Sequence, residues 1–214
     1  MSENLLIYGA GGFAREVEWL ITSSPGLDFS LKGFIDDYAD DSKNTLKNVF
    51  SFEQSISNYS SAYVAIAIGN PATRKKIATK LSSHQVNTMT LIHDSVQVHP
   101  SVKIDKGCIV CAGSQITVGI SMGAYVHVNL NCTVGHDVVI EDYVTLSPGV
   151  HISGNVRVES GALLGTGAVV INGSADEPLV IGRECVVAAG ACVTKSTDPK
   201  SLYAGVPATK KRSW

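Results

Sequence analysis

Apolar residues recur at every sixth position over the C-terminal half of the chain. The series runs from Ile92 to Val170 without a polar member, and after five extra residues it resumes at Ile181 and ends at Val193. An α-helix has a period of 3.6 and a strand a period of 2, so neither produces this spacing. A six-residue period corresponds to one short strand plus one turn, and three such units form an 18-residue triangular coil. The pattern predicts a parallel β-helix in which residues 18 apart stack at roughly 4.8 Å.

A second small or aliphatic residue follows four places after most of these apolar positions, and it is also expected to point inward. Cys108, Cys132 and Cys185 occupy this position. A thiol packs well there as a small apolar group, which favours buried cysteines over disulfides or metal ligands. Cys108 and Cys111 form a CxxC pair, but the repeat places them on different phases and no second pair follows, so a zinc site is not expected.

The first part of the chain has a different pattern, in which short apolar runs alternate with amphipathic ones. A further helix is expected to begin at Pro71 with Asn70 as its cap, and Arg74, Lys75 and Lys76 are expected along its exposed side. This βαβ order predicts a small Rossmann-like parallel sheet, with ligands at the carboxyl ends of the strands. The other expected elements are strands over residues 5–8, 33–35 and 63–68 and a helix over residues 14–22.

A glycine turn that fits GxGxxA follows the first expected strand and opens the first helix. Glycines let the backbone approach a phosphate closely, and the amides at the helix start favour negative charge. Two aspartates at the end of the second strand could accept hydrogen bonds from a ribose or a base. The alternative is a plain tight turn and a solvated loop. The sheet is too small for a hydride-transfer enzyme, so we expect it to hold a nucleotide-linked substrate. The candidate residues are Gly9, Gly11, Gly12, Phe13, Asp36, Asp37, Gly69 and Asn70.

One histidine is the candidate general base. His136 is the third residue of its hexapeptide, hence at an outward turn, and the neighbouring Asp137 could orient it and raise its basicity. Gly154 lies one coil further on, where its amide could hold the oxygen of an acyl group. The alternative is that Gly154 only supplies a turn with positive φ. His127 precedes Thr145 by one coil, which predicts a polar strip along one edge of the prism.

The motifs GAGGFAREV, FIDD, AIGNP, VNLNCTVGHD and YAGVPAT occur in an order and spacing that cover essentially the whole chain. In this the chain resembles the bacterial acetyltransferases typified by sialic acid O-acetyltransferase and by the N-acetyltransferases of nucleotide-activated amino sugars. The resemblance implies a left-handed β-helix, acetyl transfer from acetyl-CoA, and a homotrimer with active sites between neighbouring β-helices. It implies His136 as the base and Asp137 as the residue that tunes it.

The resemblance also implies contacts for the co-substrate, largely through main-chain groups. Phe13 stands where many relatives have a histidine, and it could form an apolar wall against the methyl group of a deoxy sugar. Residues 171–180 contain the five-residue insertion, whose direction the sequence leaves open. The implied acetyl-CoA contacts are Thr145, Gly154, Thr166, Ala189, Gly205 and Lys210, with Lys211 and Arg212 completing a basic tail.

Bulk properties narrow the function classes. The 214 residues suit two modest domains, residues 1–90 and 91–214, and are 44% hydrophobic and 17% charged. A net charge of −2 predicts no nucleic acid partner, and no apolar run is long enough for membrane insertion. A strand is expected after four residues, which leaves no signal peptide and predicts a cytoplasmic protein.

The expected function is N-acetylation, without a metal, of a nucleotide-linked sugar, a 4-amino-4,6-dideoxy sugar, for bacterial surface glycan synthesis. O-acetylation of a sugar hydroxyl, in sialic acid or a similar acceptor, is the alternative, because hydroxyls and amines need the same base. Two further alternatives are a noncatalytic nucleotide-binding scaffold and a β-helix carbonic anhydrase. The anhydrase would need zinc-binding histidines, and the spacing of His127, His136 and His151 does not fit that pattern.

Overall fold

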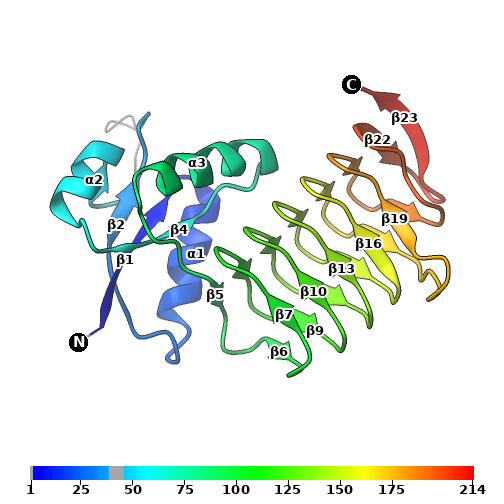
Figure 1. Cartoon of the computed structure of the whole chain (residues 1–214), viewed down its shortest axis with the longest axis horizontal. Helices are drawn as coiled ribbons and strands as arrows, with labels where there is room; N and C mark the ends of the chain where they lie inside the picture. The colour runs from blue at the N-terminus through cyan, green and yellow to red at the C-terminus, as the bar shows by residue number, and fades with distance from the viewer. Residues whose placement is uncertain (1, 39–45) are drawn as a thin grey trace.

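The computed structural model describes residues 2–38 and 46–214. A small α/β unit and a long stack of coils lie end to end, with the two termini at opposite ends of the molecule (Figure 1). The order of the two parts is the one that the hydrophobic patterns predict.

The N-terminal unit is a four-stranded sheet in the order β3-β2-β1-β4, and every pair in it is parallel. Its strands are β1 (Glu3–Tyr8), β2 (Phe29–Ile35), β3 (Val49–Phe50) and β4 (Tyr63–Ile66), and its helices are α1 (Gly12–Thr22), α2 (Phe52–Asn58) and α3 (Pro71–Ser83). The strand order reverses between β1 and β4, which places a crevice at their carboxyl ends. Three strands and two helices were predicted, whereas β3 and α2 were not.

Side chains alternate across this sheet as the two-residue period of a strand requires. Leu5 and Ile7 pack with Val17 of α1 on one face, and Leu6 packs with Phe52 of α2 on the other. The sheet is therefore covered by helices on both faces.

The coils form three flat faces of short parallel strands, and the predicted six-residue positions are the last residues of these strands from β5 to β21. The five-strand face holds β7 (Lys103–Ile104), β10 (Ser121–Met122), β13 (Val139–Ile140), β16 (Val156–Val158) and β19 (Leu179–Ile181). The six-strand face holds β6 (Gln97–Val98), β9 (Gln115–Ile116), β12 (Thr133–Val134), β15 (His151–Ile152), β18 (Val169–Val170) and β21 (Cys192–Val193). The eight-strand face holds β5 (Leu91–Ile92), β8 (Ile109–Val110), β11 (His127–Val128), β14 (Thr145–Leu146), β17 (Leu163–Leu164), β20 (Val186–Val187), β22 (Ser201–Ala204) and the antiparallel β23 (Thr209–Ser213).

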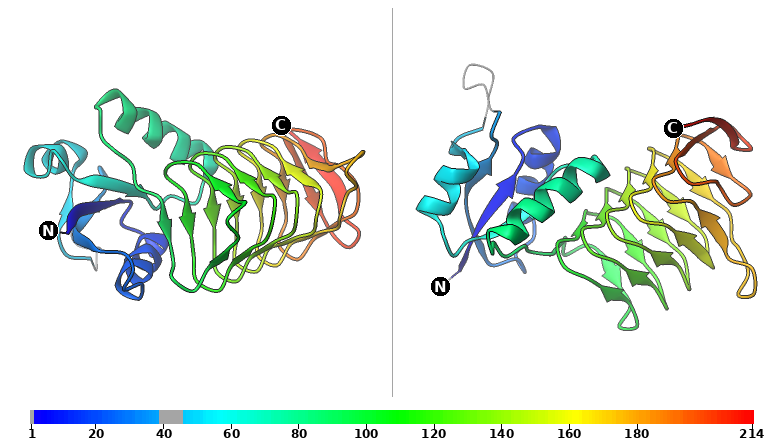
Figure 2. Two further views of the ribbon diagram at one scale, coloured as in Figure 1. Left: turned by 60° about the horizontal axis from the view of Figure 1, so that its bottom comes forward. Right: turned by 45° about the horizontal axis from the view of Figure 1, so that its top comes forward.

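The 18-residue register is confirmed. His127 pairs with Thr145, and Thr133 pairs with His151, each one coil apart. Figure 2 shows the coils stacked one behind the next. Their interior is a continuous apolar column that includes the fully buried Cys108, Cys132 and Cys185 as predicted.

The corners between faces repeat one backbone conformation. Every sixth residue from Gly107 to Gly167 has a positive φ, whether or not it is a glycine. Asp137 has φ 57° and Asn155 has φ 55°, whereas Gly154 is not among the residues with positive φ. The alternative that Gly154 serves to supply a left-handed turn is therefore wrong, because Asn155 takes that position.

The N-terminal unit packs against the eight-strand face near its first coils. Leu91, Ile109 and Cys111 of this face lie in one apolar cluster with Val17 of α1. Arg74 of α3 is fully buried at the same boundary, which corrects the expectation that it is exposed. Its guanidinium donates hydrogen bonds to the Tyr125 and Tyr143 carbonyls and to the Thr145 hydroxyl of the coils. Among the described residues, no helix is long and apolar enough to cross a membrane.

Candidate active site

His136 and Asp137 form a hydrogen-bonded pair at the corner between the six-strand and five-strand faces. Nδ1 of His136 lies 2.9 Å from Oδ2 of Asp137, and the two side chains are 56% and 63% exposed. A carboxylate only accepts hydrogen bonds, so Nδ1 is the protonated nitrogen and Nε2 keeps its lone pair. The pair thus presents an oriented imidazole with a free acceptor to solvent, as a general base requires.

Gly154 lies directly against this imidazole. A Cβ at Gly154 would collide with Nε2 of His136, so only glycine leaves room for the ring. The Gly154 N–H forms no hydrogen bond with any residue that the structure describes. The corner therefore combines a candidate base and a free amide one coil apart. We call His136, Asp137 and Gly154 the His136 corner.

The five-residue insertion projects from the same corner. The Gly173 N–H donates to the Gly154 carbonyl at 3.1 Å, and the Leu179 N–H donates to the Asn155 carbonyl at 3.1 Å. Between these two bonds the chain turns back, with the Ser174 N–H donating to the Glu177 carbonyl at 3.0 Å. The insertion is thus a short loop on the coil next to Gly154. This settles its direction, which the sequence left open.

Three of the predicted cofactor residues lie on another corner. Thr166, Ala189 and Gly205 follow strands of the eight-strand face, before or beside strands of the six-strand face, and the Gly190 N–H donates to the Thr166 carbonyl at 2.9 Å. Within one chain the width of the six-strand face separates this group from the His136 corner. Lys210 lies on β23, where its Nζ is 2.8 Å from Oδ2 of Asp198.

The predicted polar strip of His127 and Thr145 is not exposed. His127 is fully buried and Thr145 is 4% exposed, because α3 covers them. The Thr145 hydroxyl donates to the Gly69 carbonyl at 2.8 Å and accepts from Nη2 of Arg74 at 2.9 Å. Burial, and then the charge of Arg74, hold the pKa of His127 well below its usual value. This position does not support the predicted contact of the Thr145 side chain with a cofactor.

Phe13 also faces the β-helix. Its ring lies 5.3 Å from the His127 ring, and the side chain is half-buried. It therefore stands at the boundary between the glycine turn and the eight-strand face. A sugar methyl could reach it only at that boundary.

The glycine turn and the segment after β4 lie side by side, as predicted. The Gly9 N–H donates to the Ile35 carbonyl at 2.8 Å, and a Cβ at Gly9 would lie 3.0 Å from the Ala67 carbonyl oxygen. Gly11 and Gly69 have open space above them, and Gly12, Gly69 and Asn70 are exposed. Gly9 lines a pocket and Asn70 lines a separate, larger groove, whereas Gly11, Gly12 and Gly69 are exposed and line neither of these two cavities.

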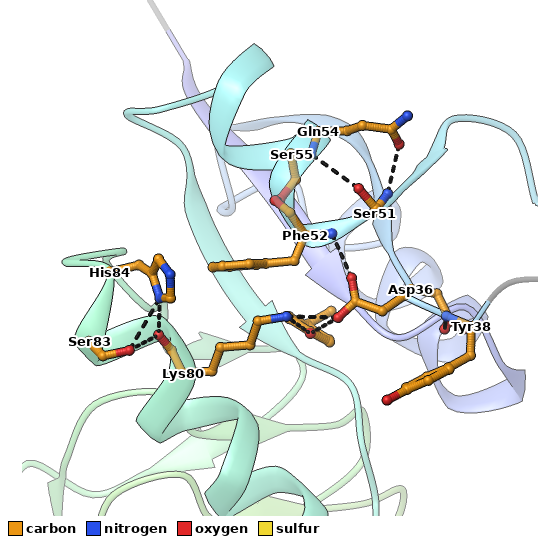
Figure 3. Close-up of polar contacts among 11 residues, drawn as sticks. Asp36, Tyr38, Ser51, Phe52, Gln54, Ser55, Lys80, Ser83 and His84 are labelled. Carbon is orange, nitrogen blue, oxygen red and sulfur yellow. Dashed lines mark hydrogen bonds and ion pairs between the residues drawn. The ribbon is translucent and has the colours of Figure 1, made fainter.

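The second pair of predicted substrate residues lines a pocket of about 320 Å³ beside Gly9. Asp37 accepts from Tyr8 at 2.9 Å, from Lys80 at 2.8 Å and from the Phe52 N–H at 2.7 Å. Burial opposes its ionisation, but the hydrogen bonds outweigh burial and lower its pKa. Lys80 reaches this carboxylate alongside the Phe52 ring (Figure 3).

Asp36 is less occupied than Asp37. Its Oδ1 accepts from the Tyr38 N–H at 2.9 Å, and its other oxygen has no partner among the residues described. Asp36 is therefore the better placed of the two to accept a hydrogen bond from a ligand hydroxyl. The Asp37 oxygens are already bonded to Tyr8, Lys80 and the Phe52 N–H.

A larger groove of about 680 Å³ lies between α3 and the eight-strand face. Lys75 and Lys76 of α3, Tyr143 and Arg183 of the coils, and the C-terminal Trp214 line it. Sequence reasoning missed these residues. The two lysines were expected to be exposed, but the groove forms where α3 lies against the coils, and Arg74 bonds α3 to the coils at this boundary.

The candidate histidines of the zinc alternative do not gather within the chain. His127 lies on the eight-strand face, His136 at the opposite corner and His151 on the six-strand face. Within residues 2–38 and 46–214, no group of three His, Cys, Asp or Glu residues is placed to hold a metal ion.

Comparisons with known proteins identify the family of the chain. The family model described as the PglD N-terminal domain matches residues 4–81. A GDP-perosamine N-acetyltransferase from Escherichia coli O157:H7 is 33% identical over 186 residues, which cover 82% of this chain and 81% of the relative.

Two solved structures resemble the whole chain. WeeI from Acinetobacter baumannii AYE is 33% identical with a TM-score of 0.89, covering 98% of this chain and 100% of its own. The acetyltransferase domain of PglB from Neisseria gonorrhoeae FA1090, in complex with acetyl coenzyme A, is 28% identical with a TM-score of 0.87, covering 99% of this chain and 100% of its own. The predicted Rossmann-like sheet and left-handed β-helix are confirmed, and the chain belongs to the family of nucleotide-amino-sugar N-acetyltransferases.

Proposed function

We propose that this protein transfers an acetyl group from acetyl-CoA to the amine of a nucleotide-linked 4-amino-4,6-dideoxy sugar, in the synthesis of a bacterial surface glycan. The observation that carries the proposal is the His136 imidazole, held by Asp137, with Nε2 packed against Gly154 at the place where a Cβ would stand. A relative named as a GDP-perosamine N-acetyltransferase and a structural neighbour solved with acetyl coenzyme A support the two substrates.

The corner supplies the groups that direct acetyl transfer needs. Nε2 of His136 takes the proton of the sugar amine as the nitrogen attacks the thioester carbonyl. The Asp137 carboxylate stabilises the imidazolium that forms, and the Gly154 N–H donates to the carbonyl oxygen as it gains negative charge. The imidazolium then returns the proton to the departing sulfur.

The proposal includes a homotrimer in which each site is shared between two copies. The glycine turn packs toward the eight-strand face, and the His136 corner is the corner opposite that face. One chain therefore cannot bring a sugar held in its own nucleotide crevice to its own His136. A neighbouring copy can supply the His136 corner to this crevice, because in a cyclic oligomer different surfaces of two copies contact each other.

The same assembly joins the separated cofactor residues. In the proposal, Thr166, Ala189 and Gly205 of one copy face the His136 corner of the next, and Lys210 offers its charge to the phosphates of coenzyme A. The five cysteines form no disulfide among themselves, which suits a reducing compartment. We place the reaction in the cytoplasm, where acetyl-CoA is available.

The test is a product assay with defined acceptors. Purified protein is given acetyl-CoA and GDP-, UDP- or dTDP-linked 4-amino-4,6-dideoxyhexoses, and mass spectrometry follows the products. Matched sugars with a hydroxyl in place of the amine are the controls. We expect one amino sugar to gain an acetyl amide. Acetylation of only the hydroxyl sugars would establish the O-acetyltransferase alternative, and no acetylated product at all would overturn the proposal.

A further inference from the structure

Arg74 is a buried cation without a carboxylate partner among the described residues. Its side chain is fully buried between α3 and the coils. Nε donates to the Tyr125 carbonyl at 2.9 Å, and Nη2 donates to the Tyr143 carbonyl at 2.8 Å. Burial lowers the pKa of Arg74 to about 9. Such a charge is costly to bury, and here backbone carbonyls compensate it together with the Thr145 hydroxyl at 2.9 Å and Nδ1 of His127 at 3.2 Å.

The other end of the guanidinium holds the segment after β4. Nη1 donates to the Ile68 carbonyl at 2.8 Å and to the Gly69 carbonyl at 3.1 Å. The Thr145 hydroxyl reinforces the second bond by donating to the same Gly69 oxygen at 2.8 Å. Two consecutive carbonyls are thus turned toward the interior.

This arrangement determines where two amides point. In a planar trans peptide the N–H is antiparallel to the C=O of the same unit. The N–H groups of Gly69 and Asn70 therefore point away from Arg74, toward the exposed side of the segment. Neither N–H has a hydrogen-bond partner in the described part of the chain, and the space beside Gly69 is open.

The two amides lie between the two cavities of the N-terminal unit. Ile68 lines the pocket beside Asp36, and Asn70 lines the larger groove below α3. Lys76 lines both. A molecule with its nucleoside in the pocket and its sugar in the groove would carry its diphosphate across this segment.

We propose that Arg74 is a positioning residue for the nucleotide-sugar substrate: it holds the Ile68 and Gly69 carbonyls inward so that the N–H groups of Gly69 and Asn70 face the diphosphate. The inference rests on the proposed function. Arg74 touches no substrate atom and acts through these two peptide units. Its positive charge beneath them also favours an anion above, because a buried charge is screened little by solvent. Lysine cannot replace it, since an ammonium has no planar fork to reach carbonyls in several directions.

The test compares nucleosides with their diphosphates. Calorimetry measures the binding of guanosine, uridine and thymidine, and of GDP, UDP and dTDP, to wild-type protein, Arg74→Lys and Thr145→Val. The control is Arg157→Lys, an exposed arginine of β16 paired with Glu141. For the base that binds, we expect Arg74→Lys to weaken the diphosphate roughly 10- to 100-fold while the nucleoside keeps its affinity. Thr145→Val should show a smaller loss of the same kind.

Equal affinity of wild type and Arg74→Lys for the diphosphate would overturn this inference alone. Equal losses for nucleoside and diphosphate would also overturn it, because they indicate a general structural defect. Wild-type protein that binds no nucleotide would overturn both this inference and the proposed substrate.

Hydrogen exchange tests the same inference without a folding risk. In wild-type protein, the Gly69 and Asn70 amides should exchange freely alone and become protected by the diphosphate but not by the nucleoside. Absence of that protection would overturn the inference even if Arg74→Lys does not fold. In kinetics, Thr145→Val should raise KM for the nucleotide sugar several-fold and leave kcat and KM for acetyl-CoA near wild type.

Discussion

The imidazole of His136 packs against the backbone of Gly154, one coil away, so closely that a methyl group at residue 154 would overlap Nε2. The two residues lie in neighbouring coils, whose backbones are separated by about one strand spacing, roughly 4.8 Å, and the Gly154 N–H has no partner among the residues described. The proposed mechanism thereby couples proton acceptance and oxyanion stabilisation in a single pair of residues. Substitutions at Gly154 and at His136 test the pair separately.

Gly154→Ala should displace the imidazole and reduce turnover at least 10-fold, because the new Cβ occupies the position of the ring. The control is the double variant His136→Ala/Gly154→Ala. Removal of the ring removes the collision, so thermal unfolding should show that alanine at 154 costs less stability in the His136→Ala background. An equal cost in both backgrounds would contradict the contact.

His136→Asn should lower turnover by about 10² to 10⁴ while the protein stays folded, since asparagine retains a polar side chain but cannot accept the proton. Steady-state rates with acetyl-CoA and the acceptor found by the product assay measure the effect. Circular dichroism and thermal unfolding check the fold. Turnover near wild type would remove His136 from the mechanism.

The proposed trimer predicts that mixing two impaired variants recovers activity. Co-expression of His136→Asn with a nucleotide-crevice variant, Asp36→Ala, in equal amounts should leave about one quarter of the sites intact, because in the proposed trimer each site takes its base and its crevice from different copies. The separately expressed variants are the controls. Persistent inactivity of the mixture would show that each site is built from one chain.

Asp37→Asn should destabilise the protein above about pH 5 and much less at pH 3. The folded-state pKa of Asp37 is lowered from its ordinary 3.8, so its contribution is present above that value and is lost as the pH falls through the folded pKa. Solvent screening keeps the contribution to about 0.5–1 kcal/mol. Thermal unfolding at several pH values measures it.

A matched aspartate provides the control for this pH series. Asp28→Asn should show little difference at any pH, because Asp28 makes no hydrogen bond or ion pair with the described residues. A wild-type advantage over Asp37→Asn that grew as the pH fell would contradict the role given to this carboxylate.

Three buried thiols should resist modification in the folded protein. Burial raises the pKa of Cys108 and of Cys111 to about 12, and that of Cys132 to about 11. Thiolates react and thiols do not, so Ellman's reagent at pH 8 should modify these residues only after denaturation. Cys192, which is partly exposed, should react first. Rapid modification of all five would contradict the packing.

The β-helix could be predicted in detail because its signal is repeated in every coil. The apolar residue at each strand end from Ile92 to Val193 follows the same six-residue spacing, so a misassigned residue at one position does not change the prediction. The stacking of His136 and Gly154 followed from the 18-residue count alone. The segment Phe52–Asn58 is short and its pattern is not repeated elsewhere, so its helix was not predicted. Ser51 and Gln54 form a capping box, which is the sequence signal for the start of this helix.

Arg74 shows why other parts of the site could not be predicted so easily. Its charge suggested solvent, yet it shares the helical face of Pro71, Ala78 and Leu81, which are all buried. That spacing is the signal for its burial. What the spacing cannot show is the set of coil carbonyls that receive the guanidinium, since Tyr125, Tyr143 and Val144 are 51 to 70 residues away.

The buried guanidinium also limits how this protein can be engineered. A chimera that grafted the N-terminal sheet onto a different hexapeptide prism would bring Arg74 to a surface without the Tyr125 and Tyr143 carbonyls, leaving an uncompensated charge in the seam. To exchange nucleotide specificity between relatives, the N-terminal sheet and the coils as far as Thr145 should therefore be transferred together as one segment.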